Sequence, residues 1–291
     1  MPQHALSSAC RFSRTAFFII LAVFVFPNAH AQNQPEPLAV RNVRGGIWQV
    51  QGGSGANTGF FVGKHEVLVI DAKMTGESAL AMIAEIGKVT PNPVRRVLLT
   101  HSDRDHVNGL SGFPKGLTII AHEETRRLMD GAFQEDALRS RLPDVTFSER
   151  LTLRVDSTEL ILLYFGPAHT CGDAVVYFPA EKVVFIGDLL FIGRDPLIHL
   201  AKNGSSFGWV RVLKSILELD ADLFLSGHAD PAGRVDLEAM IRSLEEKQAG
   251  VKALADQGRT LEEVKAAFGV EPGGRWMSLV EVIYRELSMK E

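Results

Sequence analysis

His101-Ser102-Asp103-Arg104-Asp105-His106 is the stretch that decides the fold of this 291-residue chain. It directly follows residues 94–100, which read as a buried strand. Two histidines and two aspartates within six residues make a dense group of metal-binding side chains. A polar loop at the end of a strand would also account for the stretch, so its role depends on what the rest of the chain supplies.

Other expected strands also end in a histidine or an aspartate. His169, Asp188 and His228 each follow a later strand, and Asp71 ends an earlier one. Active sites of α/β proteins assemble at the carboxyl ends of strands. We therefore expect these side chains to meet those of residues 101–106.

The geometry expected for the opening motif is that of an extended loop. Side chains two residues apart then point the same way, so His101, Asp103 and Asp105 would share one face and His106 would lie on the other. One loop could in this way supply ligands to two adjacent metals.

The order and spacing of these residues resemble the metallo-β-lactamase fold hydrolases over residues 46–230. The last three intervals between motif residues are 63, 19 and 40 residues. The resemblance implies an α/β fold, a four-layer αβ/βα sandwich with C-terminal helices, and a dinuclear metal centre between the sheets. It is carried by His101, Asp103, Asp105, His106, His169, Asp188 and His228, together with Asp71.

The resemblance also implies a ligand set. The first metal would be held by His101, Asp103 and His169, the second by Asp105, His106 and His228, with Asp188 bridging both and Asp71 orienting a ligand loop. The family usually has a histidine where this chain has Asp103. The extra carboxylate could weaken zinc binding and admit iron or manganese. Alternatively, Asp103 hydrogen-bonds a neighbour and the first metal is loosely held or absent.

The activity implied is metal-assisted hydrolysis with two Zn²⁺ ions. A metal-bound hydroxide would attack a small ester, thioester, lactone or lactam, with Asp105 as the catalytic residue that orients the hydroxide and later helps to pass a proton to the leaving group. Lys202 and Asn203 would bind substrate from the loop over residues 193–206, where the role of His199 stays open. The alternatives are an iron-dependent oxidoreductase similar to the sulfur dioxygenases of this fold, and a non-catalytic metal-binding protein.

Residues 1–31 have the pattern of a secretory signal peptide. Arg11 and Arg14 precede an apolar run over residues 16–26, and Ala29-His30-Ala31 fits a cleavage site. The run is shorter than the roughly 20 residues that span a bilayer. We expect cleavage after Ala31, a periplasmic or secreted protein, and no stable membrane anchor afterwards.

The mature chain is expected to have three parts. A flexible lead-in over 32–45 precedes a catalytic domain over 46–235, and a helical extension over 236–291 follows, with a capping box at Thr260 and Glu263. The net charge of −4 and the lack of a basic stripe argue against nucleic acid as a partner. A small-molecule substrate is the partner expected, and the sequence does not indicate an oligomeric state.

Overall fold

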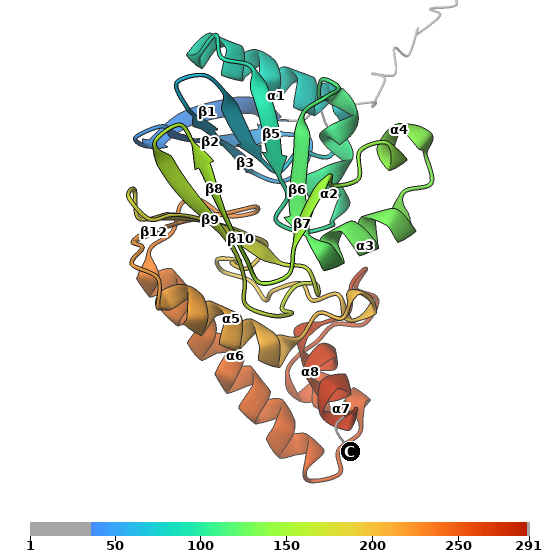
Figure 1. The fold of residues 1–291 in the computed structure, drawn as a ribbon. Helices are drawn as coiled ribbons and strands as arrows, with labels where there is room; N and C mark the ends of the chain where they lie inside the picture. Colours follow the sequence, from blue (N-terminus) through green and yellow to red (C-terminus); the bar gives the residue numbers. More distant parts are fainter. Residues whose placement is uncertain (1–35, 290–291) are drawn as a thin grey trace, which may run out of the picture. The chain divides into compact units, whose positions relative to one another are not determined.

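Two β-sheets form the centre of the fold in the computed structural model, which describes residues 36–289 (Figure 1). The expected signal peptide lies outside these described residues. The first sheet contains, in spatial order, β1 (Glu36–Arg44), β2 (Ile47–Gly53), β3 (Thr58–Val62), β4 (Val67–Ile70), β5 (Val94–Leu98), β6 (Thr118–His122) and β7 (Val145–Phe147). The second contains β12 (Leu223–Ser226), β11 (Val183–Gly187), β10 (Ala174–Phe178), β9 (Thr158–Tyr164) and β8 (Arg150–Val155).

Helices precede, join and follow these strands. The α-helices are α1 (Gly76–Val89), α2 (Arg104–Val107), α3 (Glu123–Ala132), α4 (Asp136–Arg139), α5 (Ser206–Leu217), α6 (Arg234–Ala255), α7 (Leu261–Ala267) and α8 (Leu279–Ser288), and the 3₁₀ turns are η1 (Asn108–Gly112) and η2 (Leu200–Lys202). Within residues 36–289, no helix combines the length and the apolar composition needed to cross a bilayer.

Strand β4 shows why the first sheet is buried on both faces. Its side chains alternate, so Val67 and Val69 pack with Met82 of α1, whereas Leu68 and Ile70 face the core between the two sheets. Parallel strands covered on both faces read as continuous apolar runs. The Val-Leu-Val-Ile sequence of β4 therefore fits its position.

Strand β10 gives the matching picture in the second sheet. Val175 and Tyr177 pack in one core cluster with Trp209 of α5, while Val176 and Phe178 face the core between the sheets. The layers are thus helix, sheet, sheet and helix, as Figure 1 shows with α1 on one side and α5 and α6 on the other. The predicted four-layer αβ/βα sandwich is confirmed.

The C-terminal helices extend the outer layer on the second sheet. Leu237 and Leu244 of α6 and Val282 of α8 are buried in the same core cluster as β10 and α5. The predicted capping box is confirmed at the start of α7, where Thr260 and Glu263 exchange side-chain and backbone hydrogen bonds.

The expected flexible lead-in is wrong over Glu36–Arg44, because these residues form β1. They pair antiparallel with β2, for example Val40 with Val50. Backbone hydrogen bonds need no apolar sequence, and Leu38 and Val40 pack on the core beneath α1. Pro37 is compatible with a strand here because β1 is at the edge of the sheet.

Candidate metal centre

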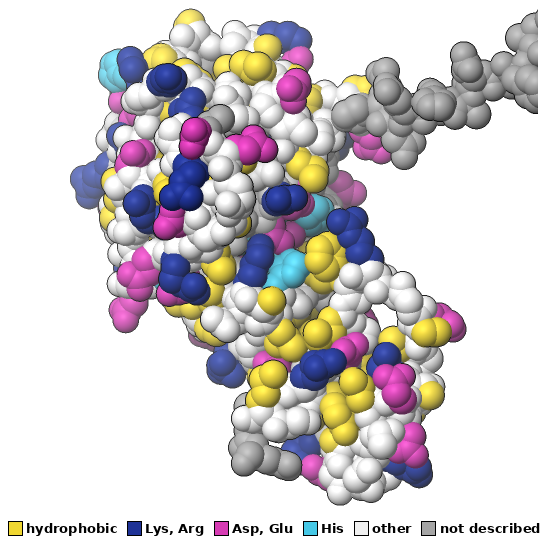
Figure 2. Space-filling view, turned by 90° about the vertical axis from the view of Figure 1, so that its right-hand side faces the viewer, with side chains coloured by type: hydrophobic (Ala, Val, Ile, Leu, Met, Phe, Trp, Pro, Cys, Tyr) yellow, Lys and Arg dark blue, Asp and Glu magenta, His cyan; other side chains and the backbone are white. Residues whose placement is uncertain are grey.

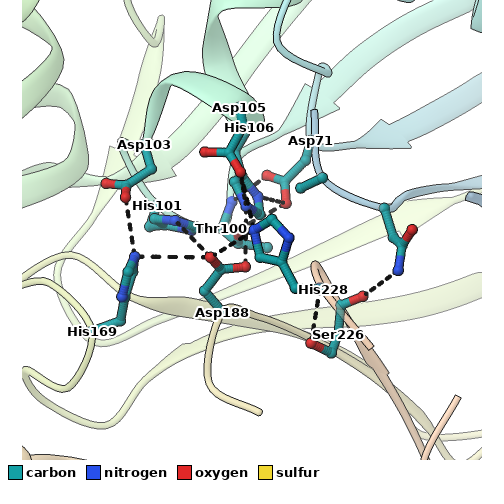
Figure 3. Close-up of polar contacts among 12 residues, drawn as sticks. Asp71, Thr100, His101, Asp103, Asp105, His106, His169, Asp188, Ser226 and His228 are labelled. Atoms are coloured by element: carbon teal, nitrogen blue, oxygen red, sulfur yellow. Dashed lines mark hydrogen bonds and ion pairs between the residues drawn. The ribbon is translucent and has the colours of Figure 1, made fainter. Parts of the chain in front are cut away.

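The predicted site residues lie together at the carboxyl ends of strands from both sheets (Figure 3). β4 leads into Asp71, and β5 leads into residues 101–106. In the other sheet, β11 leads into Asp188 and β12 into His228, while His169 comes from the loop between β9 and β10. β4 with β5 and β11 with β12 are parallel pairs, so each pair ends at one edge of its sheet.

Asp71 is a buried anchor for the residues around it. Its carboxylate accepts hydrogen bonds of 2.8 Å from the Thr100 backbone N–H and from the Thr100 hydroxyl. His106 Nδ1 donates to Asp71 Oδ2 over 2.8 Å, which leaves His106 Nε2 as the ring nitrogen with a lone pair. Asp71 has a left-handed backbone, with a φ of 61°, a conformation that is uncommon for a residue with a side chain.

One cluster contains His101, His169 and Asp188. Their ligand atoms lie within 4.8 Å of one another, and all three residues are buried. His169 Nδ1 donates to the Leu197 carbonyl over 2.7 Å, so its Nε2 faces the cluster. His101 Nε2 and His169 Nε2 lie 4.0 and 3.9 Å from Asp188 Oδ2.

The other cluster contains Asp105, His106, Asp188 and His228. His228 Nε2 lies 3.0 Å from Asp105 Oδ2 and 3.1 Å from Asp188 Oδ2. His106 Nε2 lies 3.1 Å from Asp188 Oδ1. Asp188 therefore belongs to both clusters. In one it lies beside His101 and His169, and in the other beside His106 and His228.

The glycine before His228 permits this close packing. A Cβ on Gly227 would lie 2.3 Å from Asp188 Oδ1 and 2.7 Å from His106 Cε1. Both distances are shorter than any ordinary contact of a Cβ atom, so a larger residue would displace one of these groups. The Ser-Gly-His sequence at the end of β12 thus has a steric explanation.

The donor set fits a bound cation. Among the residues that the structure describes, His101 Nε2, His106 Nε2 and Asp188 Oδ1 are buried atoms that make no hydrogen bond, although His106 Nε2 and Asp188 Oδ1 lie 3.1 Å apart. Unpaired buried polar atoms are costly, and a metal ion would satisfy them. Imidazole nitrogen and carboxylate oxygen are the ligands that zinc and its neighbours bind.

The carboxylates around the histidines also favour a bound cation. Burial opposes a charged imidazole, yet the Asp105 and Asp188 carboxylates raise the pKa of His228 to about 9. Burial likewise opposes the charge on His169, but the Asp103 and Asp188 carboxylates raise its pKa to about 9. The carboxylates therefore favour a positive charge at the centre, which a proton or a metal ion supplies.

The opening motif is not the extended loop that we expected. Residues from Arg104 to Val107 form the helical turn α2, with Asp103 at its N-terminal boundary. Successive side chains on a helix point about 100° apart, so Asp105 and His106 both reach the same cluster instead of opposite sides. A turn this short leaves no periodic pattern in the sequence.

Asp103 departs from the ligand set that the resemblance implied. It groups with His169 and His199, not with His101. Asp103 Oδ2 accepts from His199 Nε2 over 2.9 Å and lies 3.2 Å from His169 Nε2, and Lys202 Nζ donates to Oδ1 over 2.5 Å. Burial opposes ionisation, but the hydrogen bonds from His169 and His199 hold the pKa of Asp103 well below its usual range.

The two residues expected to bind substrate have different surroundings. The Lys202 ammonium group donates its hydrogen bond to Asp103. Asn203 is exposed, has a left-handed backbone with a φ of 53°, and ends η2. The structure does not bring Asn203 into either cluster. His199, whose role the sequence left open, is brought into contact with Asp103 and His169.

Lys73 is a residue that sequence reasoning missed. Its side chain is fully buried, and Nζ donates over 2.8 Å to the carbonyls of Gly52 and Ala56. Gly52 lies in β2 and Ala56 in the loop that joins β2 to β3, and the Ala56 N–H donates to the Asp105 carbonyl. Lys73 thus supports the backbone of a cluster residue. Its signal in the sequence is weak, a lysine two positions after Asp71.

A curated relative shares part of its sequence with this chain. The chain is 31% identical over 205 residues to the 2,4-dinitroanisole O-demethylase subunit alpha of Nocardioides sp. (strain JS1661). The aligned part covers 68% of this chain, and the chain spans 59% of that relative's length.

Solved structures and a family model extend the comparison. A metallo-beta-lactamase from Pontibacter korlensis is 20% identical, with a TM-score of 0.63 over 72% of this chain and 99% of that one. The DIM-1 metallo-beta-lactamase is 18% identical, with a TM-score of 0.63 over 73% of this chain and 99% of its own. At these identities the likeness shows the fold.

Residues 52–228 match the family model described as the metallo-beta-lactamase superfamily. The chain belongs to this superfamily.

Proposed function

We propose that this protein is a metal-dependent hydrolase that acts on a small ester, thioester, lactone or lactam with two metal ions. One observation carries the proposal: Asp188 is shared by two clusters in which His101 Nε2 and His106 Nε2 are buried without hydrogen-bond partners. Two adjacent cation sites that share a carboxylate are typical of hydrolytic centres. Membership of the superfamily supports the same activity.

The bound metals would supply a water of lowered pKa and would polarise the carbonyl of the substrate. His101, His169 and Asp188 would hold one ion, and Asp105, His106, Asp188 and His228 the other. We propose zinc, because imidazole donors outnumber carboxylates across the two clusters, with iron or manganese as the alternatives.

We assign proton transfer to Asp105. Its side chain is 28% exposed, whereas that of Asp188 is 5% exposed, so Asp105 is the more accessible carboxylate of its cluster. The contact with His228 holds Asp105 Oδ2, and Oδ1 would accept the proton of the attacking water and return it to the leaving group.

A substrate screen of the metal-loaded protein tests this function. Nitrocefin, homoserine lactones, lactoylglutathione, and aryl phosphate and sulfate esters cover the main classes. We expect turnover of one class, at least a hundredfold lower in Asp105→Asn. Asp220→Asn is the matched control, because Asp220 is an exposed carboxylate paired with Lys182. Metal binding without any turnover would instead support a non-catalytic metal-binding protein.

Cleavage of an aryl methyl ether is a second candidate, favoured by the identity to the O-demethylase subunit. Hydrolysis would add water at the ring carbon and release the methoxy group as methanol, leaving a phenol. An iron-dependent oxidoreductase would instead consume oxygen and a reductant and release formaldehyde. Incubation of 2,4-dinitroanisole with zinc-loaded and iron-loaded protein distinguishes the two through methanol, formaldehyde and oxygen uptake.

Export to the periplasm or medium is part of the proposal, from the signal-like pattern of residues 1–31. Expression of the full chain followed by cell fractionation and N-terminal sequencing tests it. We expect the exported protein to begin at Gln32. A cytosolic protein that retains residues 1–31 would contradict it.

A further inference from the structure

The segment between α7 and α8 returns to the metal centre. The Trp276 ring lies edge-on to the His199 ring, with centroids 5.4 Å apart and planes at 82°. His199 in turn contacts Asp103 and the ring of His169. Trp276 is therefore separated from a residue of the first cluster by a single side chain.

Hydrogen bonds hold the C-terminal part of the chain against the loop that carries Lys202. Glu286 of α8 accepts from the Ser205 hydroxyl over 2.6 Å and from the Ser206 backbone N–H over 2.9 Å. These serines begin α5, directly after the loop. The position of α8, and of Trp276 just before it, is thus tied to the site.

Trp276 keeps much of its ring surface open although burial would be favourable. The residue is 54% exposed, whereas Trp209 is fully buried in the core. Arg275 Cζ lies 5.0 Å from the Trp276 ring, and among the described residues no ion pair of Arg275 is found. The half-exposed indole with a guanidinium over its ring offers an aromatic surface and a positive charge at the same place.

A second aromatic ring and arginine lie on the His228 side of the centre, although this ring, Phe191, is buried. The Phe191 ring stacks on the His228 ring at 5.9 Å and 12°, and Arg194 Cζ lies 4.4 Å from the Phe191 ring. Figure 2 shows histidine and acidic side chains reaching the surface together, beside lysine or arginine and hydrophobic side chains. Both sides of the centre thus combine an aromatic ring with an arginine.

We propose that the site selects an aryl substrate that bears an anionic group, with Trp276 stacking on the ring and Arg275 pairing with the charge. This inference rests on the proposed function, since it names the substrate class of the same site. A saturated substrate of equal size and charge gains the ion pair but not the stacking. Trp276 therefore discriminates between an aromatic and a saturated substrate more than between a charged and a neutral one.

Two matched ligands separate stacking from charge. Binding of 4-nitrobenzoate and of cyclohexanecarboxylate to the zinc-loaded protein is measured by titration calorimetry. In Trp276→Ala we expect the Kd for 4-nitrobenzoate to rise about tenfold and that for cyclohexanecarboxylate less than threefold. Trp276→Phe should restore most of the aryl preference. Arg275→Gln should weaken both ligands to a similar extent.

Leu80→Ala is the control, because Leu80 is 57% exposed on α1. Its affinities should equal those of the wild type. Equal weakening of both ligands by Trp276→Ala, or no binding of 4-nitrobenzoate to the wild type, would overturn the aryl proposal. Trp276-dependent binding in a protein that hydrolyses nothing counts against the proposed function alone, and hydrolysis indifferent to Trp276 counts against the aryl proposal alone.

Discussion

Lys202 Nζ lies 2.5 Å from Asp103 Oδ1, so the aspartate at the centre of the opening motif is held by a lysine 99 residues further along the chain. His199 occupies the other oxygen of the same carboxylate. Asp103 is therefore held by two side chains of the loop over residues 193–206, and its carboxylate still contributes negative charge to His169 of the neighbouring cluster.

Removing Lys202 should strengthen metal binding. Lys202→Met takes an ammonium group away from Asp103 and frees its Oδ1, so we expect the weaker of the two zinc-binding constants to tighten about tenfold. Zinc titration calorimetry with metal analysis measures this. Lys214→Met is the control, because Lys214 pairs with Glu245 at the surface. Weaker zinc binding in Lys202→Met would show that the lysine positions Asp103 as a ligand.

Loss of the Asp71 charge should weaken the second metal. Asp71→Asn keeps the size of the side chain but gives His106 Nδ1 a poorer acceptor, and such changes typically reduce metal affinity about 10- to 100-fold. Competition with a chromophoric chelator reports the affinity. Asp156→Asn is the matched control, since Asp156 also has a left-handed backbone and accepts from a histidine, His65, away from the centre. Equal losses in both variants would contradict the role of Asp71.

A methyl group at Gly227 should disrupt the shared carboxylate. Gly227→Ala places Cβ against Asp188 Oδ1 and His106 Cε1, so we expect a loss of about 1–3 kcal/mol in the free energy of unfolding and of most bound metal. Gly87→Ala is the control, because Gly87 lies inside α1 with open space around it, and we expect it to stabilise the protein by about 0.5–1 kcal/mol. Urea unfolding and metal analysis measure both. Full metal retention in Gly227→Ala would contradict the expectation.

Lys73 should make stability depend on pH in the alkaline range. Burial lowers the pKa of Lys73 from 10.5 to about 8, against the opposing charge of Asp71. Between these two pH values the unfolded chain then binds more protons than the folded protein, so the free energy of unfolding rises with pH. Charged Lys73 lowers that free energy by about 3 kcal/mol below pH 8, and this destabilisation is lost as the pH rises towards 10.5. Relative to Lys73→Met, the wild type should gain stability from pH 8 to 10.

Urea unfolding of the metal-free proteins at several pH values gives the difference between wild type and variant. Lys88→Met should show no such trend, because Lys88 lies at the surface with Glu85. A difference that stays constant from pH 7 to 10 would show that Lys73 keeps its ordinary pKa when folded.

The convergence of the site was predictable because strand ends have a fixed geometry. His106, Asp188 and His228 each follow a strand of a parallel pair, and the order of elements is enough to place such ends at one edge. The partners of Asp103 were not predictable in this way. His199 and Lys202 come from an irregular loop, and only the tertiary structure determines which carboxylate they reach.

Two local elements were missed for different physical reasons. The helical turn at Arg104–Val107 is too short to show a period, and its polar residues also suit a loop. Strand β1 lacks a clear apolar alternation, so its sequence does not indicate a strand. Its backbone hydrogen bonds to β2 stabilise it as one. Trp276 reaches the centre through the packing of α8, which no motif reveals.

Asp188 makes the two cation sites thermodynamically inseparable. The Asp188 carboxylate belongs to both clusters, so its negative charge stabilises an ion in either one. An ion bound in one cluster neutralises part of the charge that would attract an ion to the other. Linkage then requires each ion to change the affinity of its neighbour by the same factor. A metal titration will report two macroscopic constants that belong to the pair, and neither constant can be ascribed to one set of histidines.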